Sequence, residues 1–368
     1  MPDLEPIEAI ALEIARTDMH YVAATFLNAS PALATAEIAL LQYGVMAAYE
    51  SQVYFGKSLG WKLEAGWAVD IAKAARMSGK FFADNKRNLE GVVTHFDKLL
   101  RANHGAFFPA KRAKFFDFLR DDLSVITIDG RPYTSLLSAH YLTGLGPSET
   151  ASLDSVGPAI HKLSVGIGNV AGILLQGSDL AMHALPPMPS IEFWDTKSAE
   201  AINRLFGGAL SQSLAAALLT VQSIAVTAER GTARAACLAC EAGARKHRFV
   251  ALFQSVTSLA ILRKVAPELV PAEMHAFLDE PESQWLLSQR KLRNGLIHLG
   301  MQDIAPQIKP GDTIDHAVAI YTKLAADEVS ARISDHLSRF ITVLTTWMLK
   351  PTTEGKIFMT ALRRPPQN

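Results

Sequence analysis

The chain has 368 residues, of which 49% are hydrophobic and 20% charged, and its 36 Lys and Arg balance its 36 Asp and Glu. This length predicts two or three compact units, and the apolar fraction excludes a disordered chain. The zero net charge excludes the broad positive field of many nucleic-acid binders, so any RNA would need a local basic patch. Abundant Ala and Leu with few β-branched runs predict an all-α fold.

The first half of the chain predicts mainly helices and one small β-hairpin. The hairpin is expected over residues 125–133, where β-branched residues precede the turn pair Asp129-Gly130. The opening residues 1–6 are acidic and lack the basic and apolar parts of a signal peptide, so we expect a cytoplasmic protein. Helical patterns cover residues 4–28, 34–59, 62–103 and 110–121.

A proline-rich segment, Pro186-Pro187-Met188-Pro189, lies near mid-chain. It stops any helix, because proline lacks the amide donor and restricts the residue before it. We therefore predict a domain boundary there. The predicted units are a mainly helical N-terminal domain of unknown role over 1–189, a helical bundle over 190–350 and a tail over 351–368.

The second unit predicts an up-and-down bundle of four or five helices. Asp195 or Ser198 is expected to cap a helix that runs to about Glu229, and Gly231 is expected to form the turn after it. Short turns between consecutive helices make neighbours antiparallel. The later helical patterns cover residues 232–265, 282–301 and 315–349.

Three further patterns favour structural over functional roles. The uncharged stretch 205–228 is long enough to span a bilayer, but its Ser, Gln and Thr side chains favour a buried bundle helix. Cys237 and Cys240 lack the second ligand pair of a zinc site. The GxGxxA pattern at 166–171 lacks the alternating strands and helices of a dinucleotide-binding fold. We therefore expect no membrane span, no metal and no cofactor.

The most informative residues are Arg293 and His298, in the run Arg-Lys-Leu-Arg-Asn-Gly-Leu-Ile-His over 290–298. A guanidinium stays charged and grips phosphate oxygens in a two-pronged way, and an imidazole gives or takes a proton near neutral pH. This pair suits phosphodiester chemistry without a metal. The same spacing also fits a helix with a solvated arginine and a structural histidine.

Arg293, followed at once by Asn294 and separated from His298 by four residues, resembles the signature of the HEPN superfamily, many of whose members are RNases. The resemblance covers about 195–350. It implies a four- or five-helix bundle with the motif on a later helix, and a homodimer with a composite cleft between protomers. One departure is Leu299-Gly300-Met301, where many family members carry an aromatic residue.

The resemblance implies a metal-independent endoribonuclease of a defence or toxin–antitoxin kind, which leaves a 2′,3′-cyclic phosphate. It also implies RNA as substrate and an antitoxin or regulatory protein as partner. A catalytically silent HEPN module that binds RNA, a nucleotide or a protein is the alternative. A helical scaffold in which the motif is chance would instead have the histidine packed inside its own bundle.

We assign His298 to proton transfer, Arg293 to stabilising charge on the phosphorane oxygens, and Asn294 to orienting the phosphate or the histidine. On an ideal helix, residues five apart diverge by about 140°. We therefore expect Gly295 to loosen the backbone, or a second subunit to complete the pair. The cations expected to track the RNA backbone are Arg290, Lys291, Arg245, Lys246 and Arg248.

Overall fold

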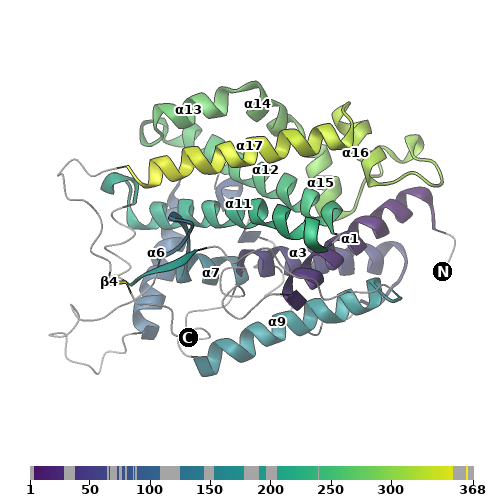
Figure 1. Ribbon diagram of the computed structural model, residues 1–368, viewed down its shortest axis with the longest axis horizontal. Helices are drawn as coiled ribbons and strands as arrows, with labels where there is room; N and C mark the ends of the chain where they lie inside the picture. The colour runs from purple at the N-terminus through teal and green to yellow at the C-terminus, as the bar shows by residue number, and fades with distance from the viewer. Residues whose placement is uncertain are drawn as a thin grey trace.

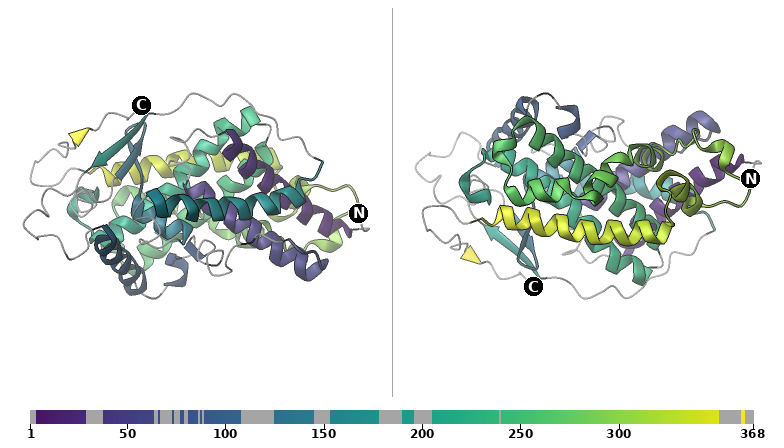
Figure 2. Two further views of the ribbon diagram at one scale, coloured as in Figure 1. Left: turned by 90° about the horizontal axis from the view of Figure 1, so that it is seen from below. Right: turned by 90° about the horizontal axis from the view of Figure 1, so that it is seen from above.

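The protein is described from a computed structural model and is mostly helical, as its composition predicts. Figure 1 shows α17 across the upper part of the molecule, α11 and α12 beneath it and α9 along the lower side, and Figure 2 shows the molecule from the side of α9 and from the opposite side. These four long helices are α9 (Leu153–Leu174), α11 (Gln212–Leu238), α12 (Glu241–Val265) and α17 (Ala326–Met348). The structure describes residues 4–28, 38–63, 66, 73, 77–78, 81–85, 87, 89–107, 125–144, 153–177, 190–195, 205–238, 240–350 and 362–363.

The first half of the chain is mainly helical, as predicted, but its helices over 136–143 and 153–174 were not among the predicted ones. The single helix predicted over 62–103 is wrong, because its later part forms two separate helices, α5 and α6. The helix predicted over 110–121 lies outside the described residues. The helices of this half that precede α9 are α1 (Pro6–Asn28), α3 (Ile38–Ser58), α5 (Phe81–Asp84), α6 (Glu90–Phe107) and α7 (Leu136–Thr143).

The predicted hairpin is confirmed by two antiparallel strands, β1 (Val125–Ile128) and β2 (Arg131–Ser135). Asp129 and Gly130 have φ values of 50° and 74°, the left-handed conformations that a type I′ turn requires. Two more strands, β3 (Ile191–Asp195) and β4 (Leu362–Arg363), extend the antiparallel sheet in the order β2-β1-β3-β4. Asp195 therefore ends a strand, and the prediction that it caps a helix is wrong.

Helix α11 is the central element of the core. Residues 213–228 are all buried, and α11 packs against α6, α7 and β2 from the first half and against α12 and α17 from the second. A helix that is apolar all round must be covered on every side. Elements on both sides of the Pro186–Pro189 segment thus share one hydrophobic core. Among the described helices, none has the length and apolarity to cross a bilayer.

The turn predicted at Gly231 is also wrong, because α11 continues through it to Leu238. A Cβ at Gly231 would collide with the Tyr21 hydroxyl of α1. The glycine therefore serves the close approach of two helices rather than a change of direction.

The helices that follow α12 are shorter than predicted. The helix expected over 282–301 is two helices, α14 (Pro281–Ser288) and α15 (Arg290–His298), preceded by α13 (Ala272–Asp279). The helix expected over 315–349 is α16 (Ile314–Thr322) and α17, separated at Lys323, which has a φ of 59°. Short 3-10 turns lie at Leu205–Gly208, Pro267–Leu269 and Ala305–Gln307.

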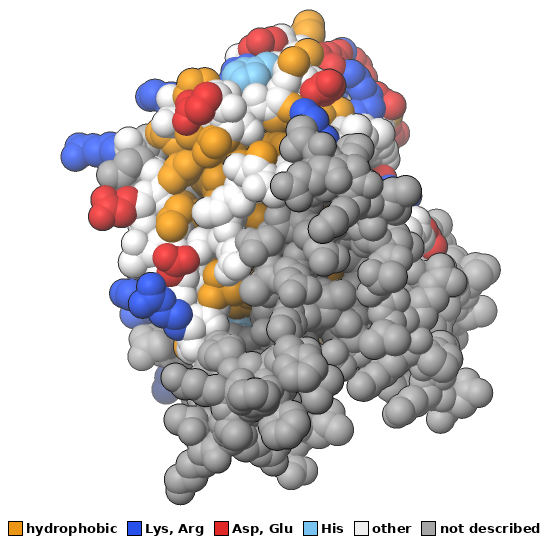
Figure 3. Space-filling model, turned by 90° about the vertical axis from the view of Figure 1, so that its left-hand side faces the viewer, with side chains coloured by type: hydrophobic (Ala, Val, Ile, Leu, Met, Phe, Trp, Pro, Cys, Tyr) orange, Lys and Arg blue, Asp and Glu red, His pale blue; other side chains and the backbone are white. Residues whose placement is uncertain are grey.

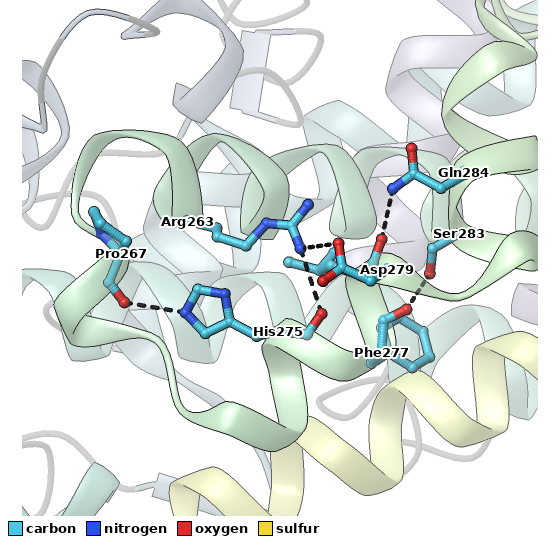
Figure 4. A network of polar contacts seen from close by, with 8 residues as sticks. Arg263, Pro267, His275, Phe277, Asp279, Ser283 and Gln284 are labelled. Carbon is cyan, nitrogen blue, oxygen red and sulfur yellow. Dashed lines mark hydrogen bonds and ion pairs between the residues drawn. The ribbon is translucent and has the colours of Figure 1, made fainter.

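A polar network fixes the α13–α14 segment, and with it the start of the motif helix (Figure 4). Arg263 of α12 donates to Asp279 at 2.7 Å and to the His275 carbonyl at 3.3 Å. Ser283 and Gln284 then donate to the carbonyls of Phe277 and Leu278, both at 2.7 Å. These side-chain bonds satisfy carbonyls that the ends of short helices leave without a partner.

Candidate active site

Helix α15 presents the motif because its apolar and polar residues lie on different faces. Leu292, Leu296 and Ile297 are buried, whereas Arg293 and His298 are half-buried. Gly295 is buried as well, and a Cβ there would lie 2.8 Å from Cγ of Met301. The helix is continuous through Gly295. The prediction that this glycine loosens the backbone is therefore wrong, and its role is to let Met301 pack closely.

His298 is held by a carboxylate from the first half of the chain. Its Nδ1 lies 2.9 Å from Oε2 of Glu50 on α3, and its side chain is 31% exposed. A carboxylate oxygen only accepts hydrogen bonds, so this contact places the ring proton on Nδ1. Nε2 is then the nitrogen with a lone pair that can accept a proton. The imidazole is not sealed among aliphatic side chains, as a chance motif in a scaffold would predict.

Glu50 is the site residue that the sequence reasoning missed. Its side chain is only 6% exposed. A signal was nevertheless present, because Glu50 is the only charged residue between Ile38 and Gly56. Carboxylates are rarely buried without a partner, since taking the charge out of water is costly. A lone acid in an apolar helix therefore indicates a polar partner elsewhere in the chain.

Arg293 lies against different neighbours. One of its terminal nitrogens donates to Oδ1 of Asn294 at 2.9 Å, and its guanidinium carbon lies 5.9 Å from the centre of the Phe253 ring on α12. Asn294 thus contacts Arg293 through its side-chain oxygen. Arg293 also lines a cavity of about 340 Å³ between α12, α14, α15 and α5.

The two motif side chains therefore face different parts of one chain. His298 contacts α3 through Glu50, whereas Arg293 contacts α12 through Phe253. This agrees with the divergence of about 140° for residues five apart on a helix.

Three of the five cations predicted to track RNA reach the surface. Arg290 is exposed and lines the same cavity as Arg293. Lys291 has an 82% exposed side chain, 3.7 Å from Asp303. Arg245 forms ion pairs with Asp315 at 3.4 Å and Asp327 at 3.2 Å, which offset its charge. Arg290 and Lys291 are thus the better placed for a phosphate backbone.

The other two predicted cations, Lys246 and Arg248, are buried. The Lys246 ammonium forms an ion pair with the Asp18 carboxylate of α1, and both side chains are almost fully enclosed. Arg248 donates to Ser334 of α17 at 2.7 Å. The prediction that these two residues track RNA is not compatible with their burial, because both serve contacts between helices.

The rejected motifs lie in ordinary structural positions. Gly166 and Ala171 of the GxGxxA pattern fall inside α9, where no loop is present to hold a pyrophosphate. Cys240 is buried, and burial raises the pKa of its thiol to about 12. Within the described ranges, no group of three or more His, Cys, Asp or Glu side chains is placed to hold a metal ion.

The described surface carries charges of both signs. On the face shown in Figure 3, Lys and Arg side chains are interspersed with Asp and Glu around hydrophobic side chains. No protein-family model, curated protein or solved structure matches this chain. The geometry of the site is therefore the basis for a functional proposal.

Proposed function

We propose that the protein is a metal-independent endoribonuclease of the HEPN type, with His298 and Arg293 as its catalytic residues. The observation that carries the proposal is the contact between Nδ1 of the half-exposed His298 and Glu50. A general base needs a lone pair and a fixed orientation, and a carboxylate at Nδ1 fixes the ring and leaves the lone pair on Nε2. This role makes Glu50 a positioning residue.

In the proposed reaction, Nε2 of His298 takes the proton from a 2′-hydroxyl of RNA. The 2′-oxygen forms a bond to the adjacent phosphorus, and the bond from phosphorus to the 5′-oxygen breaks. The leaving 5′-oxygen takes a proton from an imidazolium, so the products are a 2′,3′-cyclic phosphate and a 5′-hydroxyl. Arg293 stabilises the negative charge that builds on the phosphorane oxygens.

A homodimer with two copies of the motif fits this chemistry. One chain directs Arg293 and His298 to different neighbours, whereas a symmetric pair of α15 helices would set the arginine of one copy beside the histidine of the other. One His298 would then accept the first proton and the second, protonated, would give one to the leaving group. Arg290 and Lys291 would hold the flanking backbone, and such binding weakens as salt rises.

A binding module without cleavage is the second candidate, and the divergence of Arg293 and His298 within one chain favours it. In that case the protein would bind RNA, a nucleotide or a protein partner and leave RNA intact. An antitoxin-like or regulatory partner and a role in bacterial defence belong to the first proposal.

The test is cleavage of total RNA by the purified chain in EDTA, with the ends of the products analysed. His298→Ala should slow cleavage by about 10²- to 10⁴-fold, the usual contribution of a general acid–base group. Arg293→Ala should slow it by about 10²-fold. Glu50→Gln keeps the shape but removes the charge behind the imidazole, so we expect about a tenfold loss with a changed pH profile.

His161→Ala is the matched control, because His161 is an exposed histidine of α9. It should cleave like the unchanged protein. Equal cleavage by His298→Ala, or products that lack the cyclic phosphate, would refute the proposed chemistry. Binding of RNA without cleavage would support the module.

A further inference from the structure

A cavity of about 340 Å³ lies beside Arg293, and apart from Arg293 its lining residues have no part in the proposed proton transfers. Its volume falls in the range of about 300–1,000 Å³ that is usual for small-molecule sites. Its walls come from α12, α14 and α15 of the second half of the chain and from α5 of the first half. His298 is not among the described residues that line it.

One end of the cavity is cationic. Arg290 and Arg293 are three residues apart on α15, a spacing that brings side chains together on one side of a helix. Within the described part of the chain, Arg290 has no acidic partner. Two guanidinium groups at one cavity wall suit a phosphate, because each offers parallel donors to its oxygens.

The α12 wall offers polar groups that the protein leaves unused. The Thr257 hydroxyl is buried and has no hydrogen-bond partner among the residues that the structure describes. The Gln254 side chain, 8% exposed, likewise has no partner in that part of the chain. Buried polar groups are almost always paired, so unpaired ones that line a cavity indicate a ligand or water that pairs with them.

The remaining walls are apolar, with one acid. Phe253, Ile261 and Leu287 supply hydrophobic surface, and Asp84 of α5 supplies a carboxylate. A planar heterocycle fits beside such side chains, and its edge needs both donors and acceptors, which an amide and a hydroxyl provide. A carboxylate can accept from sugar hydroxyls. The cavity thus combines groups for a phosphate, a sugar and a base.

We propose that this cavity binds a nucleoside phosphate, either a free mononucleotide or one nucleotide of an RNA chain. Arg290 and Arg293 hold the phosphate, Gln254 and Thr257 bond the base edge, and Asp84 accepts from the ribose. The proposal goes beyond RNA cleavage, because binding here requires neither His298 nor any chemical step.

The test is titration of the full chain with AMP, GMP, CMP and UMP by calorimetry, with ribose 5-phosphate as the probe without a base. At least one mononucleotide should bind saturably and more tightly than ribose 5-phosphate. Arg290→Gln should weaken its affinity by about tenfold, the loss expected for one charged hydrogen bond. Thr257→Val should weaken it by about fivefold.

Two controls separate this site from general effects. Lys309→Gln removes one positive charge from an exposed residue that does not line the cavity, and it should leave affinity unchanged. Thr257→Val removes a hydroxyl that has no partner in the described chain, so it should keep or raise the melting temperature of the free protein while it weakens binding.

A short oligoribonucleotide identifies the source of the ligand. If it binds with the same dependence on Arg290 and Thr257 while mononucleotides do not bind, the cavity holds one nucleotide of an RNA chain. The proposal is overturned if neither binds, if ribose 5-phosphate binds as tightly as the mononucleotides, or if Lys309→Gln weakens binding as much as Arg290→Gln. His298→Ala should bind normally, so a failure of cleavage and a failure of this site are distinguishable.

Discussion

Replacing Lys246 tests whether this buried cation stabilises the fold, in contrast to the exposed Lys291. Its ammonium pairs with the Asp18 carboxylate, the two side chains are 3% and 2% exposed, and Tyr43 donates to the same carboxylate at 2.8 Å. Lys246→Met leaves Asp18 buried without its counter-charge. Removing one partner of a buried ion pair costs about 3–5 kcal/mol, a large part of the roughly 5–15 kcal/mol that stabilises a typical protein.

Substitutions at the two residues that form this contact network with Lys246 should restore the lost stability. With Asp18→Leu added to Lys246→Met, no charge is left in the core, but the Tyr43 hydroxyl loses its acceptor, at a cost of about 1–3 kcal/mol. Adding Tyr43→Phe removes that cost. The triple variant should therefore recover most of the stability that Lys246→Met alone loses.

The assay is urea unfolding followed by circular dichroism, with Lys291→Met as the matched control. Lys291 is 82% exposed, so its replacement should change the free energy of unfolding by less than about 0.5 kcal/mol. If Lys246→Met matched this control, or if the triple variant were no more stable than the single one, the account of Lys246 as a buried structural cation would be refuted.

Two further predictions concern stability. Gly243→Ala should lower the free energy of unfolding, measured in urea, by about 1–3 kcal/mol, because the new Cβ would lie 2.5 Å from the Thr17 carbonyl oxygen. Gly168 has open space around it, so Gly168→Ala should raise that free energy by about 0.5–1 kcal/mol. Equal effects of the two substitutions would contradict this packing. Burial lowers the pKa of His140 to about 4, and burial with the nearby Arg248 and Lys246 lowers that of His247 to about 3. Between pH 6.5 and 4 the unfolded chain therefore binds protons that the folded chain does not. As the pH is lowered through this range, the free energy of unfolding should decrease by about 1.4 kcal/mol per pH unit for each histidine. An unfolding midpoint in urea that holds or rises from pH 7 to pH 5 would contradict this.

The sequence was sufficient where a feature depends on neighbouring residues. Asp129-Gly130 marked the hairpin, because both residues tolerate positive φ. The apolar pattern around Arg293 placed the motif on a helix, although it did not reveal the break at Gln289. The break at Lys323 was also missed, since no proline or glycine marks it, yet Asp327 and Glu328 follow as acids typical of a new first turn.

Features that depend on residues far apart in the chain could not be predicted from the sequence. Gly231 read as a turn, but it lies inside α11 because Tyr21 of α1 packs against it. Lys246 read as a surface cation because its partner, Asp18, lies 228 residues away in the chain. Such contacts leave only a weak local signal, a charge in an apolar helix, which shows that a partner is needed but not which one.

The contact between Glu50 and His298 ties the candidate site to the first half of the chain. Helix α3 contacts α15, and α1 packs against α12, so the position of the imidazole depends on helices from both sides of the proline-rich segment. The cavity has the same character, since α5 supplies one of its walls. A sliding of α3 along α15 by one helical turn, about 5.4 Å, would move Oε2 of Glu50 out of hydrogen-bonding distance of Nδ1, which is now 2.9 Å away. The packing of the first half thus decides whether His298 is oriented, which gives that half a direct means of controlling the proposed chemistry.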